Sequence, residues 1–233
     1  MSRFLAIGDV HGCSRALDVL LADVCPRSGD TVVALGDYID RGPDSKGVLD
    51  RLLDLHRTGR LVALRGNHEI MVLNARRSPT DERYWRHFGG DQALESYVVA
   101  GRPGTLDDIP ERHWEFIESV CVDTYESDTH LFVHANALPD RPLAEQPASI
   151  LHWDAFANRG PHCSGKVMVC GHTEQHSGVP LNVGHAVCID TWAYGRGWLT
   201  CLDVTTGRLW QANQRGERRT ASLDDFPAPE DQP

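Results

Sequence analysis

The chain has 233 residues, of which 41% are hydrophobic and 24% are charged, a composition typical of a soluble globular protein. Its 33 acidic and 23 basic side chains leave a formal net charge of -10. This charge argues against nucleic acid or a membrane surface as the main partner, because proteins that bind either usually carry a basic face. No apolar run approaches the roughly 20 residues of a membrane span.

The cysteines and the amino-terminal segment indicate the compartment. The 7 cysteines are odd in number and include no Cys-x-x-Cys pair, so we expect reduced thiols rather than disulfides or a zinc knuckle. The first carboxylate, Asp9, follows a short run of apolar residues that is too brief for a signal peptide. We therefore expect a cytoplasmic protein.

The first 64 residues alternate strand-length apolar runs with helical patterns. The runs that predict strands buried on both faces of a sheet lie at residues 4–7, 31–35 and 61–64. Apolar side chains recur at helical spacing over residues 16–24, with Ser14 as the expected N-cap, and over residues 48–55, after Asp44 or Ser45. This order predicts right-handed βαβ units and a parallel sheet.

The second half of the chain has a different pattern. Residues 69–118 are expected to be mostly helical, and the segment beyond residue 120 predicts a largely antiparallel second sheet packed on the first. Its expected strands lie at residues 120–126, 130–133, 167–170, 186–190, 197–204 and 207–212. We expect one domain over residues 1–213. Residues 214–233 are polar and contain three prolines, which predicts a disordered acidic tail.

Five of the apolar runs are followed by histidine, aspartate or asparagine. These residues are Asp9, His11, Asp37, Asn67, His134 and His172. The carboxyl ends of parallel strands lie along one edge of a sheet, so the six side chains should converge although they are scattered through the chain. A single such residue is more often a cap or a turn residue, but five strand ends together indicate one site.

The chemistry of these donors indicates metal ions. Carboxylate, imidazole and amide donors suit Mn²⁺, Fe or Zn²⁺ better than they suit Ca²⁺ or Mg²⁺ alone. The six candidates exceed what one catalytic ion with an open position requires. A carboxylate can bridge two ions, and Asp37, central in chain order, is the natural candidate for that role.

Three segments of the first half resemble the signature blocks of the phosphoprotein phosphatase branch of the calcineurin-like metallophosphoesterases. These segments are Gly8-Asp9-Val10-His11-Gly12, Gly36-Asp37-Tyr38-Ile39-Asp40-Arg41-Gly42 and Arg65-Gly66-Asn67-His68-Glu69. The resemblance extends to about residue 205, and the compact length is similar to that of the bacterial and phage members. It implies a four-layer αββα sandwich with a parallel-rich first sheet and a more antiparallel second sheet.

The resemblance also implies a dinuclear metal site. By position in the motifs, Asp9, His11 and Asp37 would hold the first ion. The expected ligands of the second ion are Asp37, Asn67, His134 and His172. Two divalent ions are expected, with Mn preferred and Fe or Zn as alternatives.

Two-metal chemistry then predicts the reaction and further site residues. We expect a metal-dependent phosphomonoesterase of the serine/threonine protein phosphatase type, in which a metal-bridging hydroxide attacks phosphorus in line. His68 is the expected general acid, and Asp40 would orient its imidazole. Arg41 would bind the phosphate oxygens through its planar fork.

The sequence departs from the family pattern in places that bear on the substrate. Family members usually have a second phosphate-binding arginine near a tryptophan between the two late histidines. Here Trp153 is followed by aspartate, so we assign that role to Arg159, with Arg141 as the alternative. The aromatic residues Trp192 and Tyr194 stand where glycine is usual or nearby, and we expect them to pack rather than to bind.

Two other functions compete with the protein phosphatase. A dinucleoside polyphosphate hydrolase is the first alternative, although Glu69 and the run of residues 39–43 favour the protein phosphatase. A metal-binding scaffold without activity is the second, and the full ligand set with His68 argues against it. The expected partner is a phosphoprotein or a small phosphoester, with neither nucleic acid nor membrane, and the oligomeric state stays open.

Overall fold

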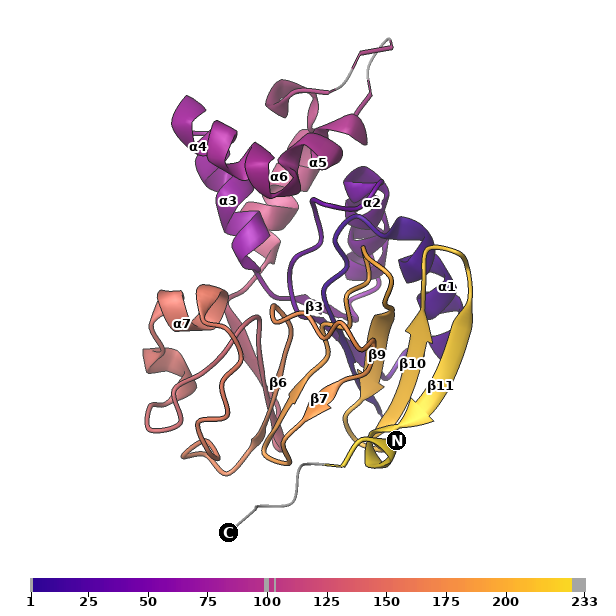
Figure 1. Ribbon diagram of the computed structural model, residues 1–233, viewed down its shortest axis with the longest axis vertical. Helices are drawn as coiled ribbons and strands as arrows, with labels where there is room; N and C mark the ends of the chain where they lie inside the picture. The colour runs from indigo at the N-terminus through magenta and orange to yellow at the C-terminus, as the bar shows by residue number, and fades with distance from the viewer. Residues whose placement is uncertain (1, 99–100, 103, 228–233) are drawn as a thin grey trace.

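The computed structural model describes residues 2–98, 101–102 and 104–227, which form two sheets packed face to face (Figure 1). In spatial order the first sheet consists of β11 (Arg218–Ser222), β10 (Arg208–Ala212), β9 (Leu199–Asp203), β1 (Phe4–Ile7), β2 (Thr31–Ala34) and β3 (Leu61–Ala63). The second sheet consists of β4 (Thr124–Glu126), β5 (His130–Val133), β6 (Val167–Cys170), β8 (Ala186–Cys188) and β7 (Leu181–Asn182).

Both sheets combine parallel and antiparallel pairs. In the first sheet β1, β2 and β3 are parallel, which confirms the predicted βαβ arrangement, and β9, β10 and β11 continue the sheet antiparallel. In the second sheet β5, β6 and β8 are parallel, with β4 and β7 antiparallel at the edges. The two parallel sets place their carboxyl ends toward the same region of the molecule, where the site described below lies.

Helices cover the outer faces of the sheets and complete the predicted αββα order. Helices α1 (Ser14–Val24) and α2 (Ser45–Arg57) cover the first sheet, and the short α7 (Ala148–Trp153) covers the second. Side chains alternate along each strand: Leu5 faces α1, whereas Ala6 faces Phe132 between the sheets. Each central strand is therefore buried on both faces, as its continuous hydrophobicity predicted.

A helical lobe rises above the sheets at the top of Figure 1 and accounts for the predicted helical segment. It consists of α3 (Asn67–Ala75), α4 (Pro79–Trp85), α5 (Asp91–Glu95) and α6 (Glu111–Glu115). The link Arg86–Gly90 joins α4 to α5 and turns at Gly89, whose φ of 110° is readily adopted only by glycine. No helix in the described ranges is long and apolar enough to cross a membrane.

One of the two expected helix caps is confirmed and the other is wrong. Helix α2 follows Asp44, whose carboxylate accepts the N–H of Gly47 at 2.8 Å. Helix α1 begins at Ser14 itself, and the cap position is Cys13, which makes no side-chain capping bond. The tight turn that precedes α1, in which Cys13 N donates to the carbonyl of Val10, moves the start of the helix by one residue.

The carboxy-terminal third differs from the sequence expectation in two ways. Residues 197–212 were assigned to the second sheet, but β9 and β10 join the first sheet beside β1. Residues 218–222, inside the tail expected to be disordered, form β11, which pairs with β10 from Arg208 to Ala212. Arg219 secures this strand by donating to Gln211 Oε1 at 2.7 Å and to the carbonyl of Gly178 at 2.7 Å. Residues 228–233 of the expected tail lie outside the described residues.

Candidate active site

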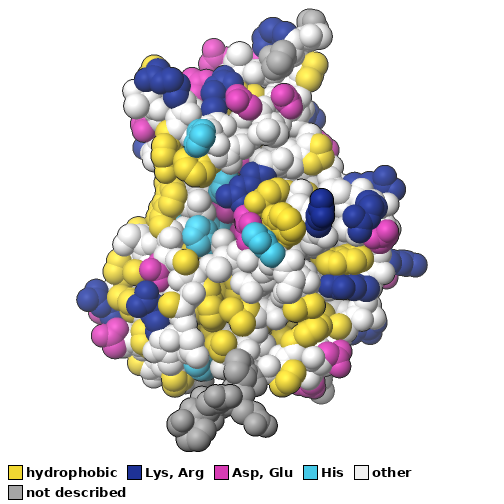
Figure 2. Space-filling view, in the orientation of Figure 1, with side chains coloured by type: hydrophobic (Ala, Val, Ile, Leu, Met, Phe, Trp, Pro, Cys, Tyr) yellow, Lys and Arg dark blue, Asp and Glu magenta, His cyan; other side chains and the backbone are white. Residues whose placement is uncertain are grey.

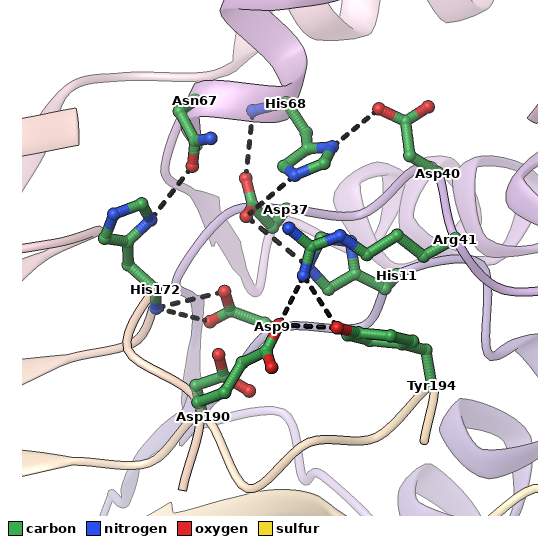
Figure 3. A network of polar contacts seen from close by, with 12 residues as sticks. Asp9, His11, Asp37, Asp40, Arg41, Asn67, His68, His172, Asp190 and Tyr194 are labelled. Carbon is green, nitrogen blue, oxygen red and sulfur yellow. Dashed lines mark hydrogen bonds and ion pairs between the residues drawn. The ribbon is translucent and has the colours of Figure 1, made fainter. Parts of the chain in front are cut away.

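Side chains that follow five strands converge where the two sheets meet below the helical lobe (Figure 3). Asp9 and His11 follow β1, Asp37 to Arg41 follow β2, and Asn67 and His68 begin α3 after β3. His134 follows β5 and His172 follows β6, so the second sheet contributes as well. Figure 2 shows histidine, acidic and basic side chains gathered at the centre of this face of the molecule. The predicted convergence is therefore present in the structure.

Asp37 occupies the centre of this group. Its Oδ2 lies 3.5 Å from His11 Nε2 and 3.9 Å from His68 Nε2, and its Oδ1 lies 3.5 Å from His134 Nε2. Two clusters of donor atoms close enough to hold a metal ion share this carboxylate: one with His11 and His68, the other with His134 and His172. Its position between the clusters is the one expected of a bridging ligand.

The imidazoles are oriented by hydrogen bonds on their outer side. His11 Nδ1 donates to the carbonyl of Ile39 at 2.9 Å, and His134 Nδ1 donates to the carbonyl of Leu35 at 2.8 Å. Since Nδ1 carries the proton in both rings, Nε2 keeps a free lone pair that is directed toward Asp37. This is the tautomer that a histidine needs to ligate a metal through Nε2.

Asn67 and Asp9 complete the predicted ligand set. Asn67 Oδ1 lies 3.0 Å from His134 Nε2 and 3.0 Å from His172 Nδ1. The two carboxylate oxygens of Asp9 accept the backbone N–H of His172 at 3.1 and 3.0 Å. Residue 171 must be glycine for this approach, because a Cβ there would overlap Asp9 Oδ1.

The backbone of the site is strained. Among the described residues other than glycine, those with positive φ are His11, Cys25, Asp37, Asp40, Arg41, His172 and Trp192. Five of them lie at the site (Figure 3), and the ring of Trp192 packs edge to face on that of Tyr194 beside it. A positive φ costs free energy in residues with a Cβ and persists where the surrounding structure enforces it, which is typical of functional sites.

The charges of the buried cluster depend on one another. Burial alone would raise the pKa of Asp37, but the neighbouring imidazoles, His134 first among them, hold it far below its usual value. Burial lowers the pKa of His134 to about 4 and moves the pKa of His11 in the same direction. At neutral pH the central carboxylate is therefore ionised, and the imidazoles of His134 and His11 are neutral.

Two further buried carboxyl groups show that the cluster lacks positive charge. Burial raises the pKa of Asp9, and the carboxylates of Asp190 and Asp37 raise it further. Burial also raises the pKa of Asp190 to about 7, and its Oδ2 has no hydrogen-bond partner among the described residues. Buried carboxyl groups without cationic partners are unfavourable, and divalent cations would supply the missing charge. The donor set thus fits the predicted ions.

His68 belongs to a hydrogen-bonded series of three side chains. Its Nδ1 lies 2.7 Å from Asp40 Oδ2, and the buried indole N–H of Trp85 donates to the same oxygen at 2.8 Å. Burial acts to lower the pKa of His68, but Asp37 and Asp40 hold it above its usual value. The ring can therefore carry a proton on Nε2, the nitrogen that faces the cluster, near neutral pH.

Arg41 lies on the open side of the cluster, next to Tyr194 and Glu174 (Figure 3). Its Nη1 forms an ion pair with Glu174 and donates to the Tyr194 hydroxyl at 3.0 Å. Its backbone N–H donates to the carbonyl of Gly89 at 3.2 Å, which connects it to the helical lobe. The guanidinium is thus placed at the mouth of the site, where it can meet an anion.

Comparison with known proteins gives the family of this chain. The model of the calcineurin-like phosphoesterase family matches residues 2–175, the segment that contains all six predicted metal ligands. The chain belongs to that family.

Relatives of this phosphoesterase carry two different activities in their names. Serine/threonine-protein phosphatase 1 of Salmonella typhimurium is 43% identical over 159 residues, covering 63% of this chain and 61% of the relative. A symmetrical bis(5'-nucleosyl)-tetraphosphatase of Ralstonia nicotianae is 43% identical over 175 residues, covering 66% of this chain and 54% of the relative. This phosphoesterase therefore matches less than two thirds of the length of either relative.

Solved structures share the fold of this phosphoesterase. A candidate diadenosine tetraphosphatase superposes with a TM-score of 0.64 at 19% identity and covers 94% of this chain and 93% of its own. A protein serine/threonine phosphatase from Saccharomyces cerevisiae superposes with a TM-score of 0.57 at 16% identity, covering 87% and 73%. At such identities the similarity establishes the αββα fold alone.

In this phosphoesterase the two arginines predicted as alternatives for the second phosphate contact have different surroundings. Arg159 is bonded to Asp154 at 2.8 Å and lines a separate small cavity with Asn136 and His162, so the structure does not bring it to Arg41. The alternative, Arg141, uses its backbone carbonyl to accept from His162 Nε2 at 2.8 Å and has an exposed side chain. The second phosphate-binding arginine stays a prediction.

Glu69 does more than cap the start of α3. It accepts the N–H of Gly66 at 2.9 Å as a cap does, and also the N–H groups of Asp37 at 2.8 Å and Tyr38 at 2.9 Å. Burial raises the pKa of Glu69 to about 7. This side chain ties the loop that carries the central carboxylate to the start of α3.

Two aromatic residues that no local pattern predicted contribute to this site. Trp85 reaches Asp40 from the end of α4, 45 residues later in the chain. Tyr194 was expected only to pack, yet its hydroxyl contacts Arg41 and its ring lies 5.2 Å from that of His11, edge to face. The only available signal for Tyr194 was its proximity to Trp192, where the chain departs from the family pattern.

Proposed function

We propose that this chain is a metal-dependent phosphomonoesterase of the serine/threonine protein phosphatase type that acts in the cytoplasm. The observation that carries the proposal is the position of His68. Its Nδ1 is bonded to Asp40, and its Nε2 faces the Asp37 carboxylate shared by the two candidate ion clusters. A protonated imidazole directed at a metal cluster is suited to donate a proton to the alkoxide that leaves phosphorus.

The proposed ion ligands keep the predicted assignment, which is supported by the Asp37 carboxylate shared between one donor cluster with His11 and another with His134 and His172. Asp9, His11 and Asp37 would hold one ion, and the second would be held by Asp37, Asn67, His134 and His172. When bound, two divalent ions of this kind activate water and neutralise charge on the phosphoryl group. The mixed oxygen and nitrogen donors support Mn, with Fe or Zn as alternatives.

The protein side chains have separate tasks in the proposed reaction. Arg41 binds the non-bridging phosphate oxygens and thereby orients the phosphoryl group over the cluster. His68 transfers the proton from Nε2 to the leaving oxygen, and Asp40 stabilises the imidazolium before that transfer. Glu69 holds the backbone of Asp37, so the central carboxylate keeps its position through the cycle.

A cavity beside Arg41 has room for the leaving group. It measures about 420 Å³ and lies between Tyr194 on one side and His87 and Phe88 of the helical lobe on the other. A cavity next to a phosphate-binding group accommodates the part of the substrate that carries the phosphate. Its size supports a peptide side chain and its flanking backbone, and also a nucleoside.

A second function, hydrolysis of dinucleoside polyphosphates, has two observations in its favour. A relative of 43% identity is named a symmetrical bis(5'-nucleosyl)-tetraphosphatase. Phe88 lines this cavity and is 38% exposed, and the ring of Tyr84, 53% exposed, lies 4.8 Å from the Phe88 ring, so that an aromatic surface is available to a nucleobase. This substrate is therefore the main competitor of the phosphoprotein.

One assay separates these functions. Metal-free protein is reloaded with Mn²⁺ and its kcat/KM is measured on phosphoserine, phosphothreonine and phosphotyrosine peptides and on diadenosine tetraphosphate. We expect the phosphoserine and phosphothreonine peptides to be turned over fastest. Rapid turnover of the dinucleotide with negligible activity on the peptides would overturn the proposal. Hydrolysis of none of these compounds by the loaded protein would indicate a metal-binding scaffold.

A further inference from the structure

Two residues that have no assigned role in the proposed reaction hold the side chain of Arg41. Glu174 accepts from its Nη1 in an ion pair, and the Tyr194 hydroxyl accepts from the same nitrogen at 3.0 Å. Tyr194 then donates its own proton to Glu174 at 2.6 Å, which closes a triangle of hydrogen bonds (Figure 3). The Arg41 guanidinium also lies 4.9 Å from the centre of the Tyr194 ring.

The two partners of Arg41 are themselves fixed from behind. His176 donates to Glu174 at 2.8 Å and stacks on Trp192 with ring centres 4.4 Å apart. Trp192 has a φ of 64°, a conformation that is costly for a bulky residue and that the surrounding packing must enforce. Residue 195 is glycine because a Cβ there would overlap the Trp192 ring. Packing therefore fixes the conformation of the segment that carries Tyr194.

The arrangement leaves one edge of the guanidinium for another ligand. The hydrogen bonds of its side chain to described residues all use Nη1, so Nη2 and Nε are not engaged by those partners. A guanidinium binds phosphate best through two parallel N–H groups. Nη2 and Nε form such a pair, on the edge opposite the one that Glu174 and Tyr194 hold.

We propose that Glu174 and Tyr194 are positioning residues that hold Arg41 with its Nε–Nη2 edge presented to the phosphate of the substrate. The proposal deepens the proposed function and rests on the phosphate contact that it assigns to Arg41. Because the side chain is ordered before the substrate arrives, binding does not have to fix its four rotatable bonds, and phosphate is bound more tightly. Neither partner touches phosphate itself.

Glu174 could instead compete with phosphate for the guanidinium, and the two roles predict opposite changes in phosphate affinity when its charge is removed. If Glu174 competed with phosphate for the guanidinium, removing its charge would tighten phosphate binding. If it oriented the guanidinium, the same change would weaken binding. Glu174 also lies two residues after His172, so a contribution to metal binding has to be measured separately.

The test uses the whole chain loaded with Mn²⁺ and inorganic phosphate as the probe. Glu174→Gln removes the charge of the carboxylate, Tyr194→Phe removes the hydroxyl and keeps the ring, and Arg41→Ala removes the guanidinium. Glu217→Gln is the matched control, since Glu217 pairs with Arg215 at 2.7 Å in the exposed turn between β10 and β11. Calorimetry gives the Kd of phosphate, elemental analysis gives bound manganese, and steady-state assays give KM and kcat.

We expect Glu174→Gln and Tyr194→Phe each to raise the Kd of phosphate about tenfold, the effect of one hydrogen bond to a charged group. KM should rise in parallel, while kcat, bound manganese and the melting temperature stay within error of the unchanged protein. Arg41→Ala should raise the Kd about 100-fold. Adding Glu174→Gln or Tyr194→Phe to Arg41→Ala should then change nothing, because the side chain that they orient is gone.

Each other outcome is decisive. Tighter phosphate binding by Glu174→Gln, loss of manganese, unchanged Kd in both variants, or equal effects in the Arg41→Ala background would each overturn the positioning role. If Arg41→Ala itself leaves the Kd unchanged, the phosphate contact in the proposed function fails instead. The two failures are thus distinguishable.

Discussion

In the proposed function His68 protonates the leaving group, and substitution of this single side chain tests that role. We predict that His68→Ala keeps its metal ions and slows hydrolysis of alkyl phosphates by about 10²–10⁴-fold, the usual contribution of a general acid. Aryl phosphates with acidic phenols should lose much less, because their leaving groups need no proton. Steady-state assays with the two ester classes and elemental analysis check this, with His56→Ala on the exposed side of α2 as the control. Equal losses on both classes would contradict it.

Trp85 would support the same proposed step indirectly, through its hydrogen bond to Asp40. Replacing it by Phe keeps most of the buried ring and removes the N–H that Asp40 accepts at 2.8 Å. We predict that Trp85→Phe slows alkyl phosphate hydrolysis about tenfold, because the carboxylate that supports His68 is less well fixed. Aryl phosphates should be affected much less.

The control for this substitution is Trp153→Phe, since Trp153 is 41% exposed. Thermal unfolding of both variants shows whether a lost hydrogen bond has merely loosened the lobe. A Trp85→Phe variant that is equally slow on both ester classes would have a structural defect instead of a positioning defect.

At the scale of secondary structure elements, Arg3 and Asp30 join the start of β1 to the start of β2. Arg3 Nη2 lies 2.5 Å from Asp30 Oδ2, and the backbone N–H groups of Arg3 and Arg27 donate to the same carboxylate. Burial acts to raise the pKa of Asp30, but the hydrogen bonds from these arginines hold it at about 2. The ionised carboxylate therefore stabilises the pairing of the two strands.

The sign of the pH dependence follows from the lowered pKa. A carboxyl group whose pKa is lower in the folded state stabilises the protein above its unfolded pKa, and this contribution is lost as the pH falls toward 2. We predict that Asp30→Asn lowers the free energy of unfolding by about 2 kcal/mol at pH 7. The difference from the unchanged protein should shrink to roughly half at pH 3. Urea titrations at the two pH values measure it, and a difference that is the same at both would disprove the ion pair's role.

For the molecule as a whole, the buried carboxylates link metal binding to folding. Asp9, Asp37 and Asp190 lie in one buried cluster that has too little positive charge of its own. We predict that a chelator lowers the melting temperature and that Mn²⁺ restores it. An ion at 100 times its Kd stabilises by about 2.7 kcal/mol, which in a domain of this size corresponds to a shift of about 5–10 °C. Calorimetry with and without chelator measures it.

Asp37→Asn provides the control for chelation. This variant lacks the carboxylate that both candidate clusters share, so its melting temperature should respond little to chelator or to Mn²⁺. If the melting temperature of the unchanged protein did not respond to chelator or to Mn²⁺, that result would contradict ion binding at this cluster.

Local patterns predicted the parts of the molecule that depend on neighbouring residues. Asp9, Asp37 and His134 each follow their own strand directly, so strand prediction was enough to expect them at one edge. Their roles as ligands stay predictions. Trp85 and Tyr194 meet Asp40 and Arg41 only through the tertiary fold, and no periodicity connects them.

The same limit explains the errors in the fold. The sequence predicted the strands of residues 197–212 correctly but could not say which sheet they join, because β9 pairs with a strand about 195 residues earlier in the chain. The polar composition of residues 218–222 favoured disorder, yet an exposed edge strand needs few apolar side chains.

The pairing of β1 with β9 also has a consequence for synthesis on the ribosome. β1 is central in the finished sheet, and Gly8 N donates to the carbonyl of Thr200 at 3.0 Å. A nascent chain that has displayed all the candidate ligand motifs still exposes one edge of β1 until residues 199–203 emerge. An open, apolar strand edge favours pairing with other chains, so we expect the growing polypeptide to aggregate more readily before β9 is made than after it.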